Sequence, residues 1–151
     1  MYEFIQILIK NIPKGIVPGS MVIVFKRNDQ RIEFLVIKAL PSKSIGFPSG
    51  KISWGENYEQ AAKRELHEET GIKADKLKIL PFIHKFRYDH IPFRPRCDQR
   101  VFLYEIDKLD KTKLYSKETE WFKWLTKDKV LKTLSHKELI DSFKLSLKYI
   151  Y

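Results

Sequence analysis

Apolar residues occur along this chain in short runs separated by polar turn sequences, and their spacing changes from strand-like to helix-like. Short runs rich in β-branched and aromatic residues predict strands. A segment in the middle of the chain, and two more near the C-terminus, carry apolar residues at helical spacing instead. The predicted strands lie near 2–9, 20–26, 33–38, 76–86, 99–106 and 119–124, and the predicted helices at 58–70 and, as a short and then a longer helix, within 127–151.

Strands that flank a central helix, with helices again at the C-terminus, predict an α/β (α+β) protein whose mixed sheet lies between helices. The 151 residues are enough for one hydrophobic core, and no repeat or linker interrupts them, so we expect a single domain over 1–151. The apolar share of 43% excludes a disordered chain. The C-terminal residues expected to contact the core are Leu139, Ile140, Phe143, Leu145, Leu147 and Ile150.

The middle helix has recognisable start and stop signals. Asn57 is a favourable N-cap, and Gln60 three residues later completes a capping-box pattern. Gly71 occupies the position at which a glycine commonly ends a helix. The residues that recur at helical spacing and predict the buried face are Tyr58, Ala61, Ala62, Leu66 and Thr70.

The charges on this helix are placed unfavourably. Arg64 and Glu68 form a favourable i,i+4 pair, but Glu65 and Glu69 have the same spacing and the same charge. Glu68 and Glu69 also lie in the last turn, the negative end of the helix dipole. A solvated surface helix is one interpretation of such a charged run. The other is a site for a hard divalent cation, because oxygen ligands around Mg²⁺ reverse the sign of the repulsion.

The full spacing decides between these interpretations. Residues 50–72 follow the pattern G-x5-E-x7-R-E-U-x-E-E-x-G-U, where U is aliphatic, and every defined position is matched. This segment resembles the Nudix box, the signature of the Nudix hydrolases, and the resemblance extends more loosely over most of the chain. It implies an α/β/α sandwich and a reaction in which a diphosphate linkage is hydrolysed with the help of Mg²⁺, or of Mn²⁺.

The resemblance assigns roles to individual residues. It implies that Glu65, Glu68 and Glu69 bind the metal, with the backbone carbonyl of Ser49 as a further ligand. Many family members have a second glycine where this chain has Ser49. Many also have glutamate where this chain has Ser53. Neither position binds metal through its side chain, so the expected activity is unaffected.

The other box positions are expected to be structural. Arg64 and Glu56 resemble the pair that orients the carboxylates, and Arg64 therefore counts among the catalytic residues. Gly50 and Gly71 are expected to serve backbone conformation. Leu66 and Ile72 are expected in the core, whereas His67 lies at a variable position of the box.

The general base has several candidates. Glu65 and Glu69 in the box are expected to be catalytic, and Glu65 is a possible base as well as a ligand. In some family members the base or an extra ligand is a glutamate late in the chain. Glu118 fits the E-x5-W pattern of those members, and Glu120 is the second choice. The alternative is that both are exposed residues on a lysine-rich loop.

Charge suggests how a substrate is bound. The formal net charge of +10 favours a polyanionic ligand or nucleic acid, although many lysines in 107–137 fit a solvated face equally well. Cations interleaved with aromatic residues follow the predicted strand at 76–86, and these suit phosphates and a stacked base, or form a basic surface loop. The candidate substrate-binding residues are Lys51, Arg87, Tyr88, Arg94 and Arg96.

Other aromatic and histidine residues are given no role in the site. Trp121, Phe122 and Trp124 are expected in the core rather than as a platform for a base, and no function is assigned to His84. Cys97 is the only cysteine, which excludes an intrachain disulfide and a cysteine zinc site and favours a cytoplasmic protein. No apolar stretch is long enough to span a membrane. The sequence is compatible with a monomer or a homodimer.

The resemblance leaves three functional hypotheses. The first is hydrolysis of nucleoside polyphosphates, either nucleoside triphosphates and their deoxy forms or diadenosine polyphosphates. The second is an RNA 5′-end pyrophosphohydrolase that acts on a 5′-triphosphate or a cap, which the basic charge favours. The third is a catalytically silent Nudix fold that binds a nucleotide and regulates, although such proteins usually lose a box carboxylate and this chain keeps them all.

Overall fold

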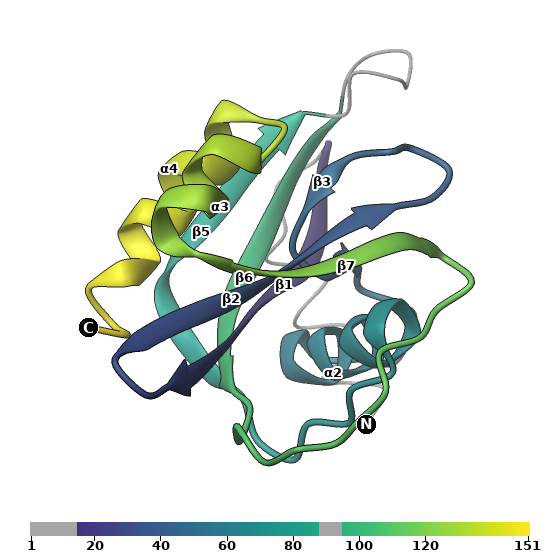
Figure 1. Cartoon of the computed structure of the whole chain (residues 1–151). Coiled ribbons are helices and arrows are strands. Elements are labelled where there is room, and N and C mark those ends of the chain that lie inside the picture. The colour runs from purple at the N-terminus through teal and green to yellow at the C-terminus, as the bar shows by residue number, and fades with distance from the viewer. Residues whose placement is uncertain (1–14, 88–94) are drawn as a thin grey trace.

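The computed structural model describes residues 15–87 and 95–151 and shows a mixed sheet with helices on both faces (Figure 1). The strand expected at 2–9 lies outside the described residues. The described strands are β1 (Ile16–Asn28), β2 (Arg31–Ala39), β3 (Ile45–Gly46), β4 (Ser49–Lys51), β5 (Lys78–Arg87), β6 (Arg96–Glu105) and β7 (Thr119–Thr126). The described helices are α2 (Tyr58–Thr70), α3 (Lys127–Thr133) and α4 (Lys137–Leu147).

Strand β1 is the centre of the sheet. The strand order is β3-β2-β1-β6-β5, with β4 also paired to β1 and β7 also paired to β2. Strands β1 and β6 run parallel over their whole shared length, from Ile16 opposite Arg96 to Phe25 opposite Glu105. The remaining pairs are antiparallel, so the predicted mixed sheet is confirmed.

The two faces of the sheet bury separate sets of apolar side chains. Successive residues of a strand point to opposite faces. Thus Val22 packs toward α2, and the next residue, Ile23, packs toward α3 and α4. The α2-side core consists of Val22, Val24, Leu35, Ile37, Ala62, Leu66, Ile72, Leu77, Phe102 and Ile106. The α4-side core consists of Met21, Ile23, Phe25, Phe34, Val36, Phe47, Leu80, Val101, Leu103, Val130, Leu134, Leu139, Phe143 and Ile150.

These two cores make the three-layer arrangement that the sequence predicts. Figure 1 shows α2 against one face of the sheet and α3 with α4 against the other. Aromatic contacts join the α4 layer to the sheet, since the ring of Phe143 meets Phe34 edge-on with 4.9 Å between centroids and lies 5.6 Å from Phe47. The predicted α/β/α sandwich is therefore confirmed.

One apolar residue expected to contact the core does not do so. Leu145 is 49% exposed, whereas Phe143 is fully buried. Two residues along a helix correspond to a rotation of about 200°, so Leu145 points away from the face that Phe143 presents to the sheet. Leu139 and Ile150 are buried as expected, and Ile140 and Leu147 are partly buried against the same core.

The aromatic residues of β7 lie where a core role predicts them. Trp121 packs against the α4-side core, and Phe122 and Trp124 pack against the α2-side core. All three are partly buried, and Lys26 places its Nζ 4.1 Å from the centre of the Trp124 ring. The expectation that these rings serve packing is confirmed. In the described residues, no helix combines the length and the apolar character that crossing a membrane requires.

Candidate active site

Helix α2 begins and ends at the residues that the sequence indicates. Asn57 Oδ1 accepts a hydrogen bond from the Gln60 backbone N–H at 2.8 Å, and Gln60 Oε1 accepts one from the Asn57 N–H at 2.9 Å. The helix ends at Gly71, whose φ of 83° is left-handed and whose N–H donates to His67 O. Both ends of the helix are therefore fixed by local contacts. These contacts also fix the direction in which Glu65, Glu68 and Glu69 point.

Arg64 is the centre of an ion-pair network on this helix. Its Nε and Nη2 donate to the two carboxylate oxygens of Glu56, at 2.6 and 3.0 Å. Nη1 donates to Glu65 at 2.7 Å and to Glu68 at 3.2 Å, and Nη2 also donates to the Lys51 carbonyl at 2.9 Å. Hydrogen bonds from Arg64 lower the pKa of Glu56, and the carboxylates raise the pKa of Arg64. Arg64 thus joins the loop before the helix to two of the predicted metal ligands.

Glu65 and Glu69 are held where their charges are unfavourable. Burial, followed by the charge of Glu65, raises the pKa of Glu69 to about 8, although a 2.8 Å hydrogen bond from the Ser49 N–H opposes the shift. Burial also raises the pKa of Glu65, against the stabilising effect of Arg64. Nearby carboxylates disfavour one another's ionised form in a partly buried site, and a cation between them reverses that effect.

The free oxygens of these carboxylates match the chemistry of a hard cation. Within residues 15–87 and 95–151, Glu65 Oε2, Glu68 Oε1 and Glu69 Oε1 accept no hydrogen bond. In the same residues no three acidic, histidine or cysteine side chains are already gathered as a complete ligand set. Arg64 and Ser49 instead take up the other oxygen of each carboxylate. Oxygen donors of this kind are those that Mg²⁺ and Mn²⁺ prefer, so the donor set fits the implied ion.

Gly50 allows the Glu65 carboxylate to approach the sheet. Gly50 lies in β4, opposite Ser20 of β1, and a Cβ at this position would overlap the Glu65 carboxylate. The space that a side chain would occupy is therefore taken by a predicted metal ligand. Glycine is required here for a close approach, and not for an unusual backbone angle.

The loop before β7 is bound to the C-terminal end of α2. Tyr115 N–H donates to Thr70 O at 3.1 Å, Ser116 Oγ to Glu68 O at 2.6 Å, and Thr119 Oγ1 to Glu69 O at 2.7 Å. These three bonds satisfy carbonyl groups that a helix end leaves without intrahelical partners. The loop is thereby fixed against the turn that carries the predicted metal ligands.

Glu118 is the residue that this loop brings to the site. Its backbone N–H donates to Ser116 Oγ at 3.0 Å, and its carbonyl accepts from the Leu40 N–H at 2.8 Å. Its charge is close enough to raise the pKa of both Glu65 and Glu69. Glu120, the second choice, instead forms a 2.9 Å ion pair with Lys38, which lowers the pKa of Glu120. The geometry therefore favours Glu118 over Glu120.

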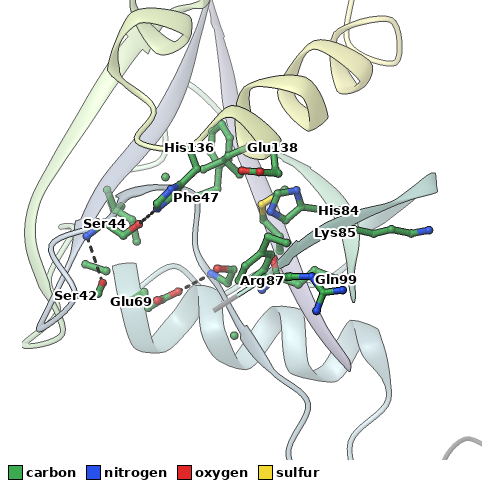
Figure 2. Close-up of a pocket in the computed structure, with 18 of the residues that line it drawn as sticks. Ser42, Ser44, Phe47, Glu69, His84, Lys85, Arg87, Gln99, His136 and Glu138 are labelled. Atoms are coloured by element: carbon green, nitrogen blue, oxygen red, sulfur yellow. Dashed lines mark hydrogen bonds between the residues drawn. The ribbon is translucent and has the colours of Figure 1, made fainter. Parts of the chain in front are cut away.

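A cavity of about 830 Å³ opens beside Glu69 and extends between the sheet and α4 (Figure 2). Among the predicted substrate-binding residues, Arg87 and Arg96 line it and Lys51 does not, while Tyr88 and Arg94 lie outside the described residues. Arg87 and Arg96 are cross-strand partners on β5 and β6. Ligand pockets of ordinary size occupy roughly 300–1,000 Å³, so the cavity can accept a nucleotide-sized molecule.

The basic side of this cavity is partly neutralised. Arg96 donates to both oxygens of Asp98, at 2.9 and 3.1 Å. A bidentate pair of this kind fixes the guanidinium group and offsets part of its charge. Arg96 is therefore held in position at the cavity, and any phosphate there would share it with Asp98.

Sequence reasoning missed several cavity residues, and His84 is the clearest case. It is 4% exposed, and its Nδ1 lies 2.8 Å from Ser142 Oγ of α4. Burial lowers the pKa of His84 to about 4, so the imidazole is neutral at physiological pH. In β5, His84 alternates in register with Leu80 and Phe86, and this spacing was the signal that it lies on the inner face of the strand. The other missed cavity residues include Phe47, Gln99, His136 and Glu138.

His84 should make the fold sensitive to acid. As pH falls below its ordinary pKa of 6.5 the unfolded chain binds a proton at His84, whereas the folded chain does so only near pH 4. Stability contributed by the neutral ring is therefore present above pH 6.5 and lost between about pH 6.5 and 4, by up to about 3 kcal/mol. Denaturant unfolding at several pH values would measure this loss. The stability of the wild type relative to His84→Gln should fall by up to about 3 kcal/mol between pH 6.5 and 4, and a pH-independent difference would contradict the assignment. His67→Gln, at an exposed histidine, is the control.

Comparison with known proteins agrees with this geometry. The family model of the NUDIX domain matches residues 17–144. The bis(5′-nucleosyl)-tetraphosphatase (asymmetrical) of Caenorhabditis elegans is 25% identical over 82% of this chain and 89% of that protein. An oxidized purine nucleoside triphosphate hydrolase of Danio rerio is 34% identical over 48% of this chain and 56% of that protein. The match thus spans little more than half the length of the Danio protein.

Solved structures show the same fold. The binary complex of a C. elegans Ap4A hydrolase superposes with a TM-score of 0.75 at 21% identity, over 89% of this chain and 97% of that chain. The complete box, the α/β/α sandwich and the match over most of the chain lead to one conclusion. The chain belongs to the Nudix hydrolase family. Its relatives include proteins named for the hydrolysis of nucleoside polyphosphates.

Proposed function

We propose that this protein is a Mg²⁺-dependent hydrolase of nucleoside polyphosphates that cleaves a diphosphate linkage with water. The observation that carries the proposal is the environment of Glu69. This residue lines a cavity of nucleotide size, and burial together with the charges of Glu65, Glu118 and Glu68 raises its pKa. The activities for which the relatives are named, on oxidized purine nucleoside triphosphates and on bis(5′-nucleosyl) tetraphosphates, support the same substrate class.

Each residue of the site has a distinct task in this proposal. Glu65, Glu68 and Glu69 would hold the metal, which when bound supplies charge neutralisation for the phosphates and a more acidic water. Arg64 keeps Glu65 and Glu68 oriented through the bonds already described. Arg87 and Arg96 face the cavity where phosphate oxygens would carry negative charge.

Glu118 is proposed to accept the proton of the attacking water. Glu118→Gln removes the base without changing the size of the side chain, so kcat should fall by about 10²–10⁴-fold. Glu120→Gln is a matched control in the same segment, because Glu120 is paired with Lys38 instead. Steady-state kinetics with saturating Mg²⁺ would measure both variants. Equal and small effects of the two changes would return the role of base to Glu65.

A substrate panel would test the proposed function. Nucleoside triphosphates, their deoxy forms, diadenosine tetraphosphate, ADP-ribose and 5′-triphosphate RNA would be incubated with Mg²⁺, and the products resolved by anion-exchange chromatography. Glu69→Gln protein serves as the blank. Turnover of a free nucleotide that the blank lacks is the expected result.

The same panel distinguishes the second candidate function, hydrolysis at the 5′ end of RNA, from the first. The net charge of +10 favours a ligand with many phosphates, and RNA is one of these. Turnover of the RNA substrate alone would establish RNA 5′-end hydrolysis in place of the first proposal. Failure on every substrate would leave a nucleotide-binding regulator as the remaining hypothesis.

A further inference from the structure

Two buried polar side chains lie next to each other on the sheet, at the inner surface of the cavity. His84 of β5 and Gln99 of β6 are directly opposed cross-strand partners. They are 4% and 3% exposed, and both line the cavity that reaches Glu69. Strands place such opposed side chains about 5 Å apart on one face, so the two form a single polar surface, here called the polar floor.

The polar floor has hydrogen-bonding capacity that the protein does not use. His84 uses one ring nitrogen on Ser142 Oγ. In the described part of the chain, the Gln99 amide makes no side-chain hydrogen bond. Among those residues no fully buried side-chain nitrogen or oxygen lacks a partner. The Gln99 amide therefore reaches the surface of the cavity, where a bound molecule can complete its hydrogen bonds.

The surroundings of the polar floor suit a flat, uncharged group. The Phe86 ring lies 5.2 Å from the His84 ring with an interplanar angle of 30°, and Phe47 lines the same cavity. Figure 2 shows the His84 ring between the sheet and Glu138, and the Lys85 side chain directed away from it. The low pKa of His84 keeps its ring neutral, so it offers a phosphate no charge. A neutral heterocycle gains more from this environment than a phosphate does.

The polar floor is also close to the Nudix box. A Cβ placed on Gly19 would lie 3.1 Å from Gln99 Cγ and 2.6 Å from the carbonyl oxygen of Gly50. Gly50 in turn lies against the Glu65 carboxylate. If the phosphates of a nucleotide lie near the carboxylates, its nucleoside part therefore extends toward Gln99 and then His84.

We propose that His84 and Gln99 hydrogen-bond to the edge of the substrate's nucleobase and thereby determine which base the enzyme prefers. The choice of ligand rests on the proposed hydrolysis of nucleotides, but binding of a base can be measured without turnover. Removing one hydrogen-bonding group from such a site leaves a polar edge of the ligand unpaired. Discrimination between bases should then be lost, rather than affinity for phosphate.

Gln99→Met tests the polar floor because it keeps the length of the side chain and removes only the amide. Binding of AMP, GMP, CMP and UMP, and of ribose 5-phosphate as the base-free counterpart, would be measured by calorimetry with a chelator present. Gln99→Met should weaken the preferred monophosphate by about tenfold and leave ribose 5-phosphate unchanged. His84→Gln, which can still bond to Ser142, should alter the order of base preference.

Ser146→Ala is the matched control, because Ser146 is buried and its hydroxyl donates to the Ser142 carbonyl of its own helix. It should change no ligand preference. Equal losses for base-bearing and base-free ligands, or no loss in Gln99→Met, would overturn the inference. Base-dependent binding by a protein that hydrolyses nothing in the substrate panel would support the polar floor and reject the proposed hydrolysis. Hydrolysis without any effect of Gln99→Met on base preference would support the proposed hydrolysis and reject the role of the polar floor.

Discussion

Glu69→Gln should lower kcat by about 10³-fold or more while leaving the protein folded. The change removes the charge of a partly buried predicted ligand. The amide oxygen of glutamine can still accept the hydrogen bond that Glu69 receives from the Ser49 N–H. Because the pKa of Glu69 is raised to about 8, its carboxyl is mostly protonated at neutral pH in the metal-free protein, and the neutral glutamine resembles that form. Thermal stability at neutral pH without metal should therefore stay the same, in contrast to the activity.

Two measurements separate this role from a general loss of structure. Titration with Mn²⁺ should show weaker metal binding in Glu69→Gln, and unfolding in a chelator should show an unchanged fold. Glu59→Gln is a suitable control, since Glu59 lies in the first turn of the same helix and its Oε1 accepts from the Leu77 N–H. Near-normal turnover by Glu69→Gln would reject the metal assignment.

Gly50→Ala is the second change with a large expected effect. The new Cβ would meet the Glu65 carboxylate, which is the mobile end of a side chain and can move away. Stability should therefore fall little, but Glu65 would leave both its position and its bond to Arg64. Small displacements of catalytic groups cost about 10²-fold in rate, so kcat should fall by at least that factor.

Gly55→Ala should show the opposite pattern. Gly55 has a φ of 84°, and a Cβ there would meet nothing within 4 Å. A non-glycine residue in that left-handed conformation costs about 1–2 kcal/mol, which lowers stability without a clash in the site. Comparing kcat with the free energy of unfolding for both variants tests the distinction. Parallel losses in both quantities for Gly50→Ala would show that its glycine serves only folding.

The parts of the site that follow from local sequence were predictable. The ends of α2 depend on Asn57, Gln60 and Gly71, which lie within or next to the helix, and the structure has the predicted ends. The Arg64 and Glu56 pair likewise links two positions eight residues apart. Such short-range features need no knowledge of the sheet.

The polar floor could not be predicted in the same way. His84 and Gln99 meet because β5 and β6 pair in one particular register, and Ser142 joins them from a helix far along the chain. A shift by one residue would have turned His84 to the opposite face. Register and helix docking are tertiary properties, and an alternating strand alone gives no sign of either.

Hydrogen bonds made by backbone groups of the site were also not predicted from the sequence. The Ser49 carbonyl stays a predicted metal ligand, and the structure adds a contact that was not expected, the hydrogen bond from the Ser49 N–H to Glu69. The hydrogen bonds from Ser116 to the Glu68 carbonyl and from Thr119 to the Glu69 carbonyl could not be predicted from the sequence either. Any residue can supply these groups, so residue type carries no signal for them.

The separation of the two cores has a consequence for how this enzyme could evolve. Val22 supports the helix that carries the carboxylates, and its neighbour Ile23 supports the face on which the cavity and α4 lie. Substitutions on the second face can reshape the choice of ligand while the first face keeps the hydrolytic chemistry intact. A preference for a new substrate could thus evolve through amino-acid substitutions on one face of the sheet.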